Sequence, residues 1–124
     1  MASDMFKSYS ITRQDDILII TYDEKTSVQD AKASISEVAS IPENNKRLYD
    51  CTKLDFASST MEDVKELVQH SLGKFSPGSI KAVVVADDLG YGLNRAFEGM
   101  RFEEKIESMV FRSKADALEW LKKK

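Results

Sequence analysis

The chain has 124 residues, of which 42% are hydrophobic and 31% charged, and its 18 basic and 21 acidic side chains give a formal net charge of −3. This length and composition are typical of one globular domain, which we expect to span residues 1–124. Charges of both signs are mixed along the chain. A nucleic-acid interface would concentrate basic residues on one face, so we expect no nucleic-acid partner.

The termini and the cysteine content indicate a cytoplasmic protein. Residues 1–10 have no apolar segment of signal-peptide type, and no apolar run approaches the ~20 residues needed to cross a bilayer, so we expect no membrane insertion. Cys51 is the one cysteine, which excludes an intramolecular disulfide and suits a reducing compartment. Residues 122–124, three lysines, are expected to form a solvated tail.

Five strands are predicted from the hydrophobic pattern. The first two are joined by the polar turn 13–16, which indicates a hairpin. The run 80–86 is apolar on both faces apart from Lys81, as expected for a central parallel strand. In chain order the predicted strands are 6–12, 17–22, 47–54, 80–86 and 106–112.

Four helices are predicted where a polar cap residue precedes apolar residues at helical spacing. The caps are expected at Thr26-Ser27, Ser59, Asp88 and Ser113, and Pro42 ends the first helix. The inward side of the second helix is predicted to carry Val64, Leu67, Val68, Ser71 and Leu72. The inward side of the third is predicted to carry Leu89, Leu93, Ala96, Phe97 and Met100.

The resulting order of elements is β-β-α-β-α-β-α-β-α. Right-handed crossovers between the successive β–α units are expected. The sequence therefore predicts an α/β domain with a mostly parallel five-stranded sheet, an N-terminal antiparallel hairpin and four helices.

The residues that could support catalysis or bind metal are few. His70 is the one histidine and lies beside the apolar stripe of its predicted helix. Cys51 falls in a predicted strand, where cysteine behaves as a small buried hydrophobe, and no candidate base neighbours it. No metal-ligand spacing or nucleophile-elbow pattern is present. We therefore expect a protein that is not an enzyme and needs no cofactor or metal.

One glycine-containing segment partly imitates a dinucleotide-binding motif. Gly90-Tyr91-Gly92 directly follows a predicted strand, but Arg95 stands where the third glycine of that motif is expected. The simpler interpretation is a tight loop-to-helix junction. Alternatively, free N–H groups at the helix start, together with Arg95, could bind an anionic group or a nucleotide.

The segment Asp50-Cys51-Thr52-Lys53-Leu54-Asp55-Phe56-Ala57-Ser58-Ser59-Thr60-Met61-Glu62 carries a family resemblance. With the order of elements, it resembles the SpoIIAA-like fold of STAS domains, found in anti-sigma-factor antagonists and transporter tails. Their third strand ends in D-L-S-x-V-x-F-I-D-S-S-G-L and leads into a helix. Here Ser58 replaces the motif's second aspartate and Met61 replaces its glycine.

The C-terminal half is similar to a bacterial subgroup of SpoIIAA-like proteins. The matching pieces are Tyr91-Gly92-Leu93-Asn94-Arg95-Ala96-Phe97 and Ala117-Leu118-Glu119-Trp120-Leu121. The subgroup is also likened to CRAL-TRIO lipid-transfer domains. That likeness implies an apolar ligand pocket or a protein-docking role.

Two interpretations of Ser59 and Thr60 remain open. Ser59-Thr60-Met61-Glu62 fits a capping box, in which Ser59 satisfies a free N–H and Glu62 reaches back. The family resemblance instead implies that Ser59 is a switch residue phosphorylated by an anti-sigma-factor kinase. The helix N-terminus would favour a phosphate, whereas the nearby Asp55, Glu62 and Asp63 would oppose it.

The functional expectation is a non-enzymatic STAS-like domain that binds a protein partner or a small apolar ligand. Tyr91 and Phe102 fall off the main apolar stripe of the third helix region and are candidates for a pocket or an interface. A homodimer is a further possibility. The alternatives are a signalling switch phosphorylated at Ser59 and an anion- or nucleotide-binding protein that uses Gly90, Gly92 and Arg95.

Overall fold

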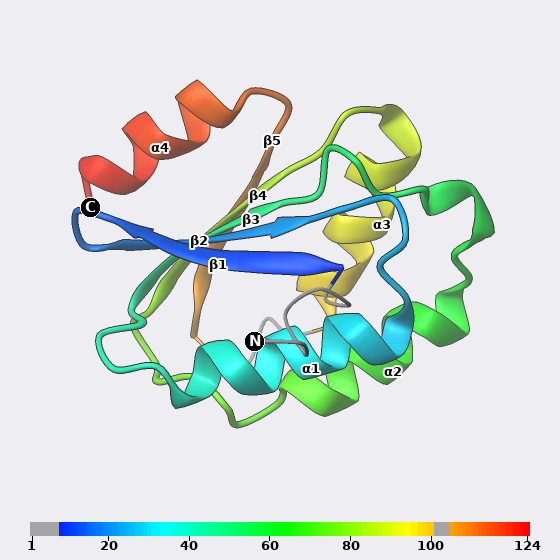
Figure 1. Ribbon diagram of the computed structural model, residues 1–124, viewed down its shortest axis with the longest axis horizontal. Coiled ribbons are helices and arrows are strands. Elements are labelled where there is room, and N and C mark those ends of the chain that lie inside the picture. Colours follow the sequence, from blue (N-terminus) through cyan, green and yellow to red (C-terminus); the bar gives the residue numbers. More distant parts are fainter. Residues whose placement is uncertain (1–7, 101–104) are drawn as a thin grey trace.

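The computed structural model describes residues 8–100 and 105–124, and its elements follow the predicted order (Figure 1). The strands are β1 (Tyr9–Gln14), β2 (Ile17–Tyr22), β3 (Lys46–Asp50), β4 (Ile80–Val84) and β5 (Glu107–Phe111). The helices are α1 (Val28–Ser40), α2 (Met61–Ser71), α3 (Asp88–Gly99) and α4 (Lys114–Lys122), and a short 3-10 helix, η2 (Phe56–Ser58), precedes α2. The α/β class is thus confirmed.

The five strands lie in the sheet in the same order as in the chain, β1-β2-β3-β4-β5. β1 and β2 pair antiparallel, and the three remaining pairs are parallel. Right-handed crossovers that all step in one direction place their helices on the same face of a sheet. Accordingly α1, α2 and α3 cover one face, and α4, which follows the last strand, covers the other (Figure 1).

The two faces have separate cores because side chains alternate along each strand. In β4, Val83 packs with the core beneath α1, α2 and α3, whereas Ala82 and Val84 pack with the core beneath α4. The α4 core consists of seven buried side chains: Ile17, Ile19, Leu48, Ala82, Val84, Ala117 and Leu121. Each β-strand of the parallel part therefore contributes to both cores.

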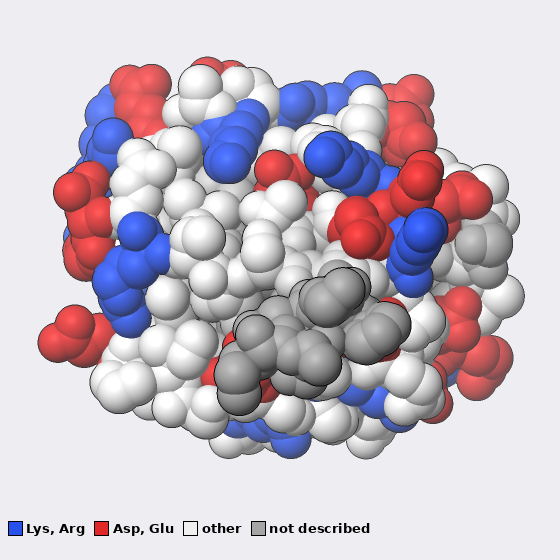
Figure 2. Space-filling view, in the orientation of Figure 1, with Lys and Arg blue, Asp and Glu red and all other residues white. Residues whose placement is uncertain are grey.

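Charged side chains lie mainly at the surface. On the face shown in Figure 2, basic and acidic residues are interspersed, and among the described residues neither sign forms a continuous patch there. Of the three C-terminal lysines, Lys122 is the last residue of α4 and Lys124 pairs with Glu107 of β5 at 2.7 Å. These lysines are exposed, as expected, but they are anchored to the domain rather than forming a free tail.

Three residues that were expected on the inward sides of helices are instead exposed. Leu72, Leu89 and Met100 retain 42%, 48% and 39% of their accessible surface. Leu72 and Met100 are the C-terminal cap residues of α2 and α3, where the chain leaves the helix. In the first turn of α3 the buried position belongs to Gly90, so Leu89 points outward. The prediction thus extended α2 and α3 one residue too far at their C-terminal ends.

Candidate functional site

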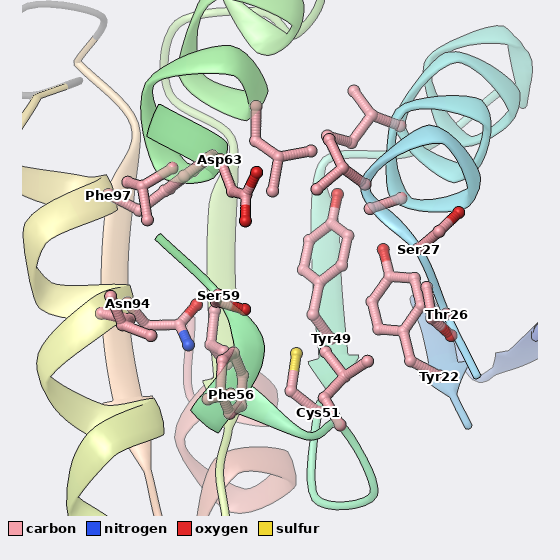
Figure 3. Close-up of a pocket in the computed structure, with 18 of the residues that line it drawn as sticks. Tyr22, Thr26, Ser27, Tyr49, Cys51, Phe56, Ser59, Asp63, Asn94 and Phe97 are labelled. Carbon is pink, nitrogen blue, oxygen red and sulfur yellow. The ribbon is translucent and has the colours of Figure 1, made fainter. Parts of the chain in front are cut away.

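A pocket of about 310 Å³ lies between the sheet and helices α1, α2 and α3 (Figure 3). Five aromatic rings line it, from Tyr22, Tyr49, Phe56, Phe75 and Phe97. Aliphatic side chains contribute most of the remaining wall, namely Val28, Ala31, Ile35, Leu54, Val64, Leu67, Val83 and Leu93. The polar lining residues are Thr26, Ser27, Cys51, Asp55, Ser59, Asp63, Lys81 and Asn94.

The parallel topology explains where this pocket lies. Neighbouring parallel strands end at the same edge of the sheet, so the loops that leave their carboxyl ends lie close together. Tyr22 is the last residue of β2 and Cys51 directly follows β3. The loop after Cys51 then carries Leu54 and Phe56 across the opening before α2 begins. The lining residues thus form one site, although they are spread between positions 22 and 97 of the sequence.

Gly90 is required by the packing of the loop against α3. A Cβ atom at this position would lie 2.8 Å from two ring atoms of Phe56, closer than Cβ atoms are found in proteins. The glycine lets the Phe56 ring pack directly on the first turn of α3, and that ring forms part of the pocket wall. The structure therefore links Gly90 to the pocket through packing.

Two tyrosines form one wall of the pocket. The rings of Tyr22 and Tyr49 are nearly parallel, with an interplanar angle of 10° and centroids 6.5 Å apart. The Tyr22 hydroxyl shares a 2.6 Å hydrogen bond with the Ser34 hydroxyl of α1. Burial raises the pKa of Tyr22 well above its usual value, and the neighbouring Tyr49 and Cys51 raise it further. Tyr22 is therefore a neutral hydrogen-bonding group in this wall.

Cys51 is buried, as predicted, but it lies just after β3 rather than within the strand. Its backbone N–H still donates to Val84 at 2.8 Å and continues the pairing with β4. Burial raises the pKa of the thiol to about 12, although Lys81 acts in the opposite direction. The thiol is consequently protonated at neutral pH, which makes it a poor nucleophile.

A buried ion pair lies at the base of the pocket. Lys81 of β4 pairs with Glu98 of α3, and their side chains are 7% and 16% exposed. The Lys81 ammonium lies 4.4 Å from the ring centroid of Phe97 and 5.5 Å from that of Tyr49. This pair was not predicted from the sequence. The available signal was the single charged residue within the apolar run of β4.

Thr60, rather than Ser59, caps α2. The Thr60 hydroxyl accepts from the Asp63 N–H at 3.1 Å, and the Asp63 carboxylate accepts from the Thr60 N–H at 3.0 Å. The predicted capping box of Ser59 and Glu62 is thus wrong by one residue. Ser59 instead ends η2, with its N–H donating to the Phe56 carbonyl at 3.0 Å. The helix therefore begins one residue later than predicted.

This shift leaves the Ser59 side chain without a capping role. Ser59 is exposed and lies at the rim of the pocket. Within residues 8–100 and 105–124, its hydroxyl has no hydrogen-bond partner. Its sequence neighbour Thr60 therefore performs the function that was expected of Ser59.

The segment Gly90–Arg95 does not form a phosphate-binding loop. Gly90, Tyr91 and Gly92 lie within the first turns of α3, and the helix is capped by Asp87, whose carboxylate accepts from the Gly90 N–H at 2.8 Å. The Arg95 guanidinium donates to the Tyr91 hydroxyl at 3.2 Å. An anion at this helix start would meet the carboxylates of Asp87 and Asp88.

The remaining predicted site residues lie away from the pocket or outside the described chain. Tyr91 is partly buried and packs against the core beneath α1, α2 and α3, but it does not line the pocket. Phe102 lies outside the described residues. The His70 ring nitrogen is 2.9 Å from the Ser36 hydroxyl, between α2 and α1.

No group of three or more His, Cys, Asp and Glu side chains in the described part of the chain is arranged to hold a metal ion. No helix in residues 8–100 and 105–124 combines the length and apolar character needed to cross a membrane.

No protein-family model matches the sequence, and a search of curated proteins found no match.

Proposed function

We propose that this protein is a non-enzymatic binding domain that holds a small, largely apolar molecule in the pocket beneath α1, α2 and α3. The observation that carries the proposal is the pocket itself, about 310 Å³ in volume and lined mainly by aromatic and aliphatic side chains. This volume falls in the range of small-molecule sites, which are mostly apolar with a few polar groups that orient the ligand.

The protonation states of the lining groups favour binding over acid–base or nucleophilic chemistry. The pKa values of Tyr22 and Cys51 are both raised, so both groups are neutral at physiological pH. General acid–base catalysis works best with a group that titrates near the operating pH. These two side chains instead provide polar contacts and shape.

The observed order of elements also supports the family part of the proposal, a STAS-like domain of the bacterial SpoIIAA-like type that acts in the cytoplasm. In that proposal the ligand or a protein partner is the functional target. An apolar ligand is favoured here, because the described chain has an open pocket at the carboxyl ends of its strands.

The test is to fill the pocket with a side chain. Ala31 of α1 lines the pocket, whereas Ala33 of the same helix is exposed. Ala31→Leu should abolish binding of small molecules, and Ala33→Leu, the matched control, should leave it unchanged. Both substitutions keep a good helix former in α1.

Two measurements provide the readout. Native mass spectrometry of the purified protein should show additional mass that disappears on denaturation and is lost in Ala31→Leu. In a thermal-shift screen, a ligand at a hundred times its dissociation constant should stabilise the native chain by about 2.7 kcal/mol. Equal behaviour of Ala31→Leu and the native chain in both measurements would reject the pocket as the binding site. Native masses also report any homodimer or co-purified protein partner.

A second candidate function is a phosphorylation switch at Ser59, as in anti-sigma-factor antagonists. The supporting observation is that Ser59 is exposed and that Thr60, not Ser59, caps α2. A hydroxyl without a structural role is open to a kinase. Incubation with an anti-sigma-factor kinase should then add one phosphate to the native chain and none to Ser59→Ala. Equal phosphorylation of both would reject Ser59 as the switch.

A further inference from the structure

The charges around the pocket bear on the kind of ligand it selects. We infer that the preferred ligand carries one protonated amine on an apolar or aromatic body, with the amine against Asp63. This inference rests on the proposed function and specifies its ligand. Three observations support it: the position of the Asp63 carboxylate, the ion pair of Lys81, and the aromatic rings that line the pocket.

Asp63 presents a carboxylate oxygen to the pocket. Its side chain projects from the first turn of α2 into the space between Phe97 and Tyr49 (Figure 3). One oxygen, Oδ2, accepts from the Thr60 N–H at 3.0 Å. The other, Oδ1, has no hydrogen-bond partner among the described residues. A ligand that donates a hydrogen bond can therefore reach an acceptor that is already held in place by the helix cap.

The cationic residue of the described lining has a carboxylate partner of its own. Lys81 pairs with Glu98, and this pair is largely buried. A ligand carboxylate beside Lys81 would therefore also be close to Glu98, and like charges repel most strongly where water is excluded. Asp55 adds another carboxylate to the lining. The balance of formal charge around the pocket consequently disfavours an anion and favours a cation.

The aromatic rings suit the same kind of ligand. Aromatic faces attract cations, and Phe97 and Tyr49 already have the Lys81 ammonium within 4.4 Å and 5.5 Å of their ring centroids. In the view of Figure 3 the Asp63 carboxylate lies between Phe97 and Tyr49. A ligand amine at Asp63 would thus have a carboxylate to pair with in a pocket that these aromatic side chains also line.

Cys51 adds a thiol to the interior of the pocket. The residue is 7% exposed, and its sulfur points toward the pocket (Figure 3). The thiol has no hydrogen-bond partner in the described part of the chain. Cys51 and the neighbouring Leu54 and Val83 offer a weakly polar surface for the apolar body of the ligand.

The experiment uses three probes that share a naphthalene ring and a two-carbon chain and differ in the terminal group. These are 2-(1-naphthyl)ethylamine, 2-(1-naphthyl)ethanol and 1-naphthylacetate, titrated into the native chain by calorimetry. The amine should bind at least tenfold more tightly than the alcohol, and the carboxylate should bind more weakly than the alcohol. An amine that binds no more tightly than the alcohol, or a carboxylate that binds most tightly, would overturn the inference.

Asp63→Asn tests the assigned carboxylate, because the amide oxygen can still accept from the Thr60 N–H. In this variant the amine should lose its advantage and bind no more tightly than the alcohol. Glu62→Gln removes an exposed carboxylate from the same turn of α2 and should change neither affinity. A loss of amine affinity as large in Glu62→Gln as in Asp63→Asn would show surface attraction and overturn the inference.

Ala31→Leu separates the two levels of the proposal. If Ala31→Leu abolishes alcohol binding and the native chain does not prefer the amine, the proposed function stands and the inference of an amine ligand is rejected. If all three probes bind Ala31→Leu as tightly as the native chain, both the pocket as the binding site and the inference of an amine ligand are rejected.

Discussion

The two faces of the sheet differ in how completely they are filled. The face beneath α4 is closed by aliphatic side chains and by Ala117, whose small size lets the helix approach the sheet. The face beneath α1, α2 and α3 includes buried polar groups, among them Lys81 and Arg47, and retains the pocket. The same strands form both faces, so the difference arises from alternate residues of one backbone. One face has a closed core, and the other combines a core with the pocket.

Arg47 illustrates how the pocket face accommodates charge. It is fully buried on β3, and its guanidinium lies 3.8 Å from the ring centroid of Phe75, a pocket-lining residue. One nitrogen donates to the Asn44 carbonyl at 2.8 Å. The adjacent residue, Leu48, packs into the closed core on the opposite face. Arg47 and Leu48 thus place a buried charge and a buried aliphatic side chain on opposite faces of the sheet.

The largest expected effect compares one leucine from each face. Leu121→Ala should lower the free energy of unfolding by about 3–4 kcal/mol, because it opens a cavity in a closed core. Leu67→Ala should cost about 1–2 kcal/mol, because Leu67 is only partly buried and lines an existing pocket. Urea denaturation measures both. Equal losses would mean that the two faces are packed equally well.

Removal of the Lys81 ammonium should have the next largest effect. Lys81→Met leaves the Glu98 carboxylate in a largely buried site without its cation, and it should destabilise the fold by about 3 kcal/mol. The double substitution Lys81→Met with Glu98→Leu should recover most of this loss, because it removes both charges. A double variant as unstable as Lys81→Met would show that packing, rather than charge, explains the effect. Thermal unfolding of the variants provides the measurement.

The Cys51 thiol should make stability depend on pH in the alkaline range. Its pKa is raised by burial to about 12 in the folded chain, against a usual value of 9.0. The unfolded thiol therefore loses its proton first, and stability falls as pH rises from about 9 towards 12. The drop in unfolding free energy between pH 8 and pH 10 should be about 1 kcal/mol larger in the native chain than in Cys51→Ala.

The comparison with Cys51→Ala isolates the contribution of the thiol, because Tyr9 and Tyr22 also have raised pKa values and are present in both proteins. Identical slopes of stability against pH for the two proteins would contradict the prediction.

The smallest expected effect separates two neighbouring hydroxyl groups at the rim. Thr60→Ala should destabilise the fold by about 1 kcal/mol, because it removes the cap of α2. Ser59→Ala should change stability by only a few tenths of a kcal/mol, as is usual for an exposed side chain without structural partners. Chemical denaturation of both variants tests the assignment. A larger loss of stability for Ser59→Ala than for Thr60→Ala would show that Ser59 caps α2.

Local sequence signals were sufficient to predict the order of elements. The apolar run of β2 and the cap residues Ser27 and Ser113 depend on neighbours within a few positions, and the structure contains both caps. Local signals were insufficient at α2, where adjacent hydroxyls at 59 and 60 both satisfy a capping pattern. The choice depends on η2, whose last hydrogen bond is made by Ser59.

The pocket could not be derived from sequence spacing. Its lining comes from three strands, three α-helices, η2 and three loops, so no short motif contains it. The sequence pattern suggested that Gly90 belongs to an anion-binding segment. The structure instead requires glycine there because the ring of Phe56, a residue distant in the chain, packs against it. Lys81 was visible as an exception in an apolar strand, but its carboxylate partner becomes apparent only when α3 packs on the sheet.

The position of α4 has a consequence for biosynthesis. Ile17, Leu48 and Val84 form an apolar surface that is covered by α4, the last element of the described chain. This surface stays exposed in a nascent chain until α4 docks, and exposed apolar surface makes such a species prone to aggregate.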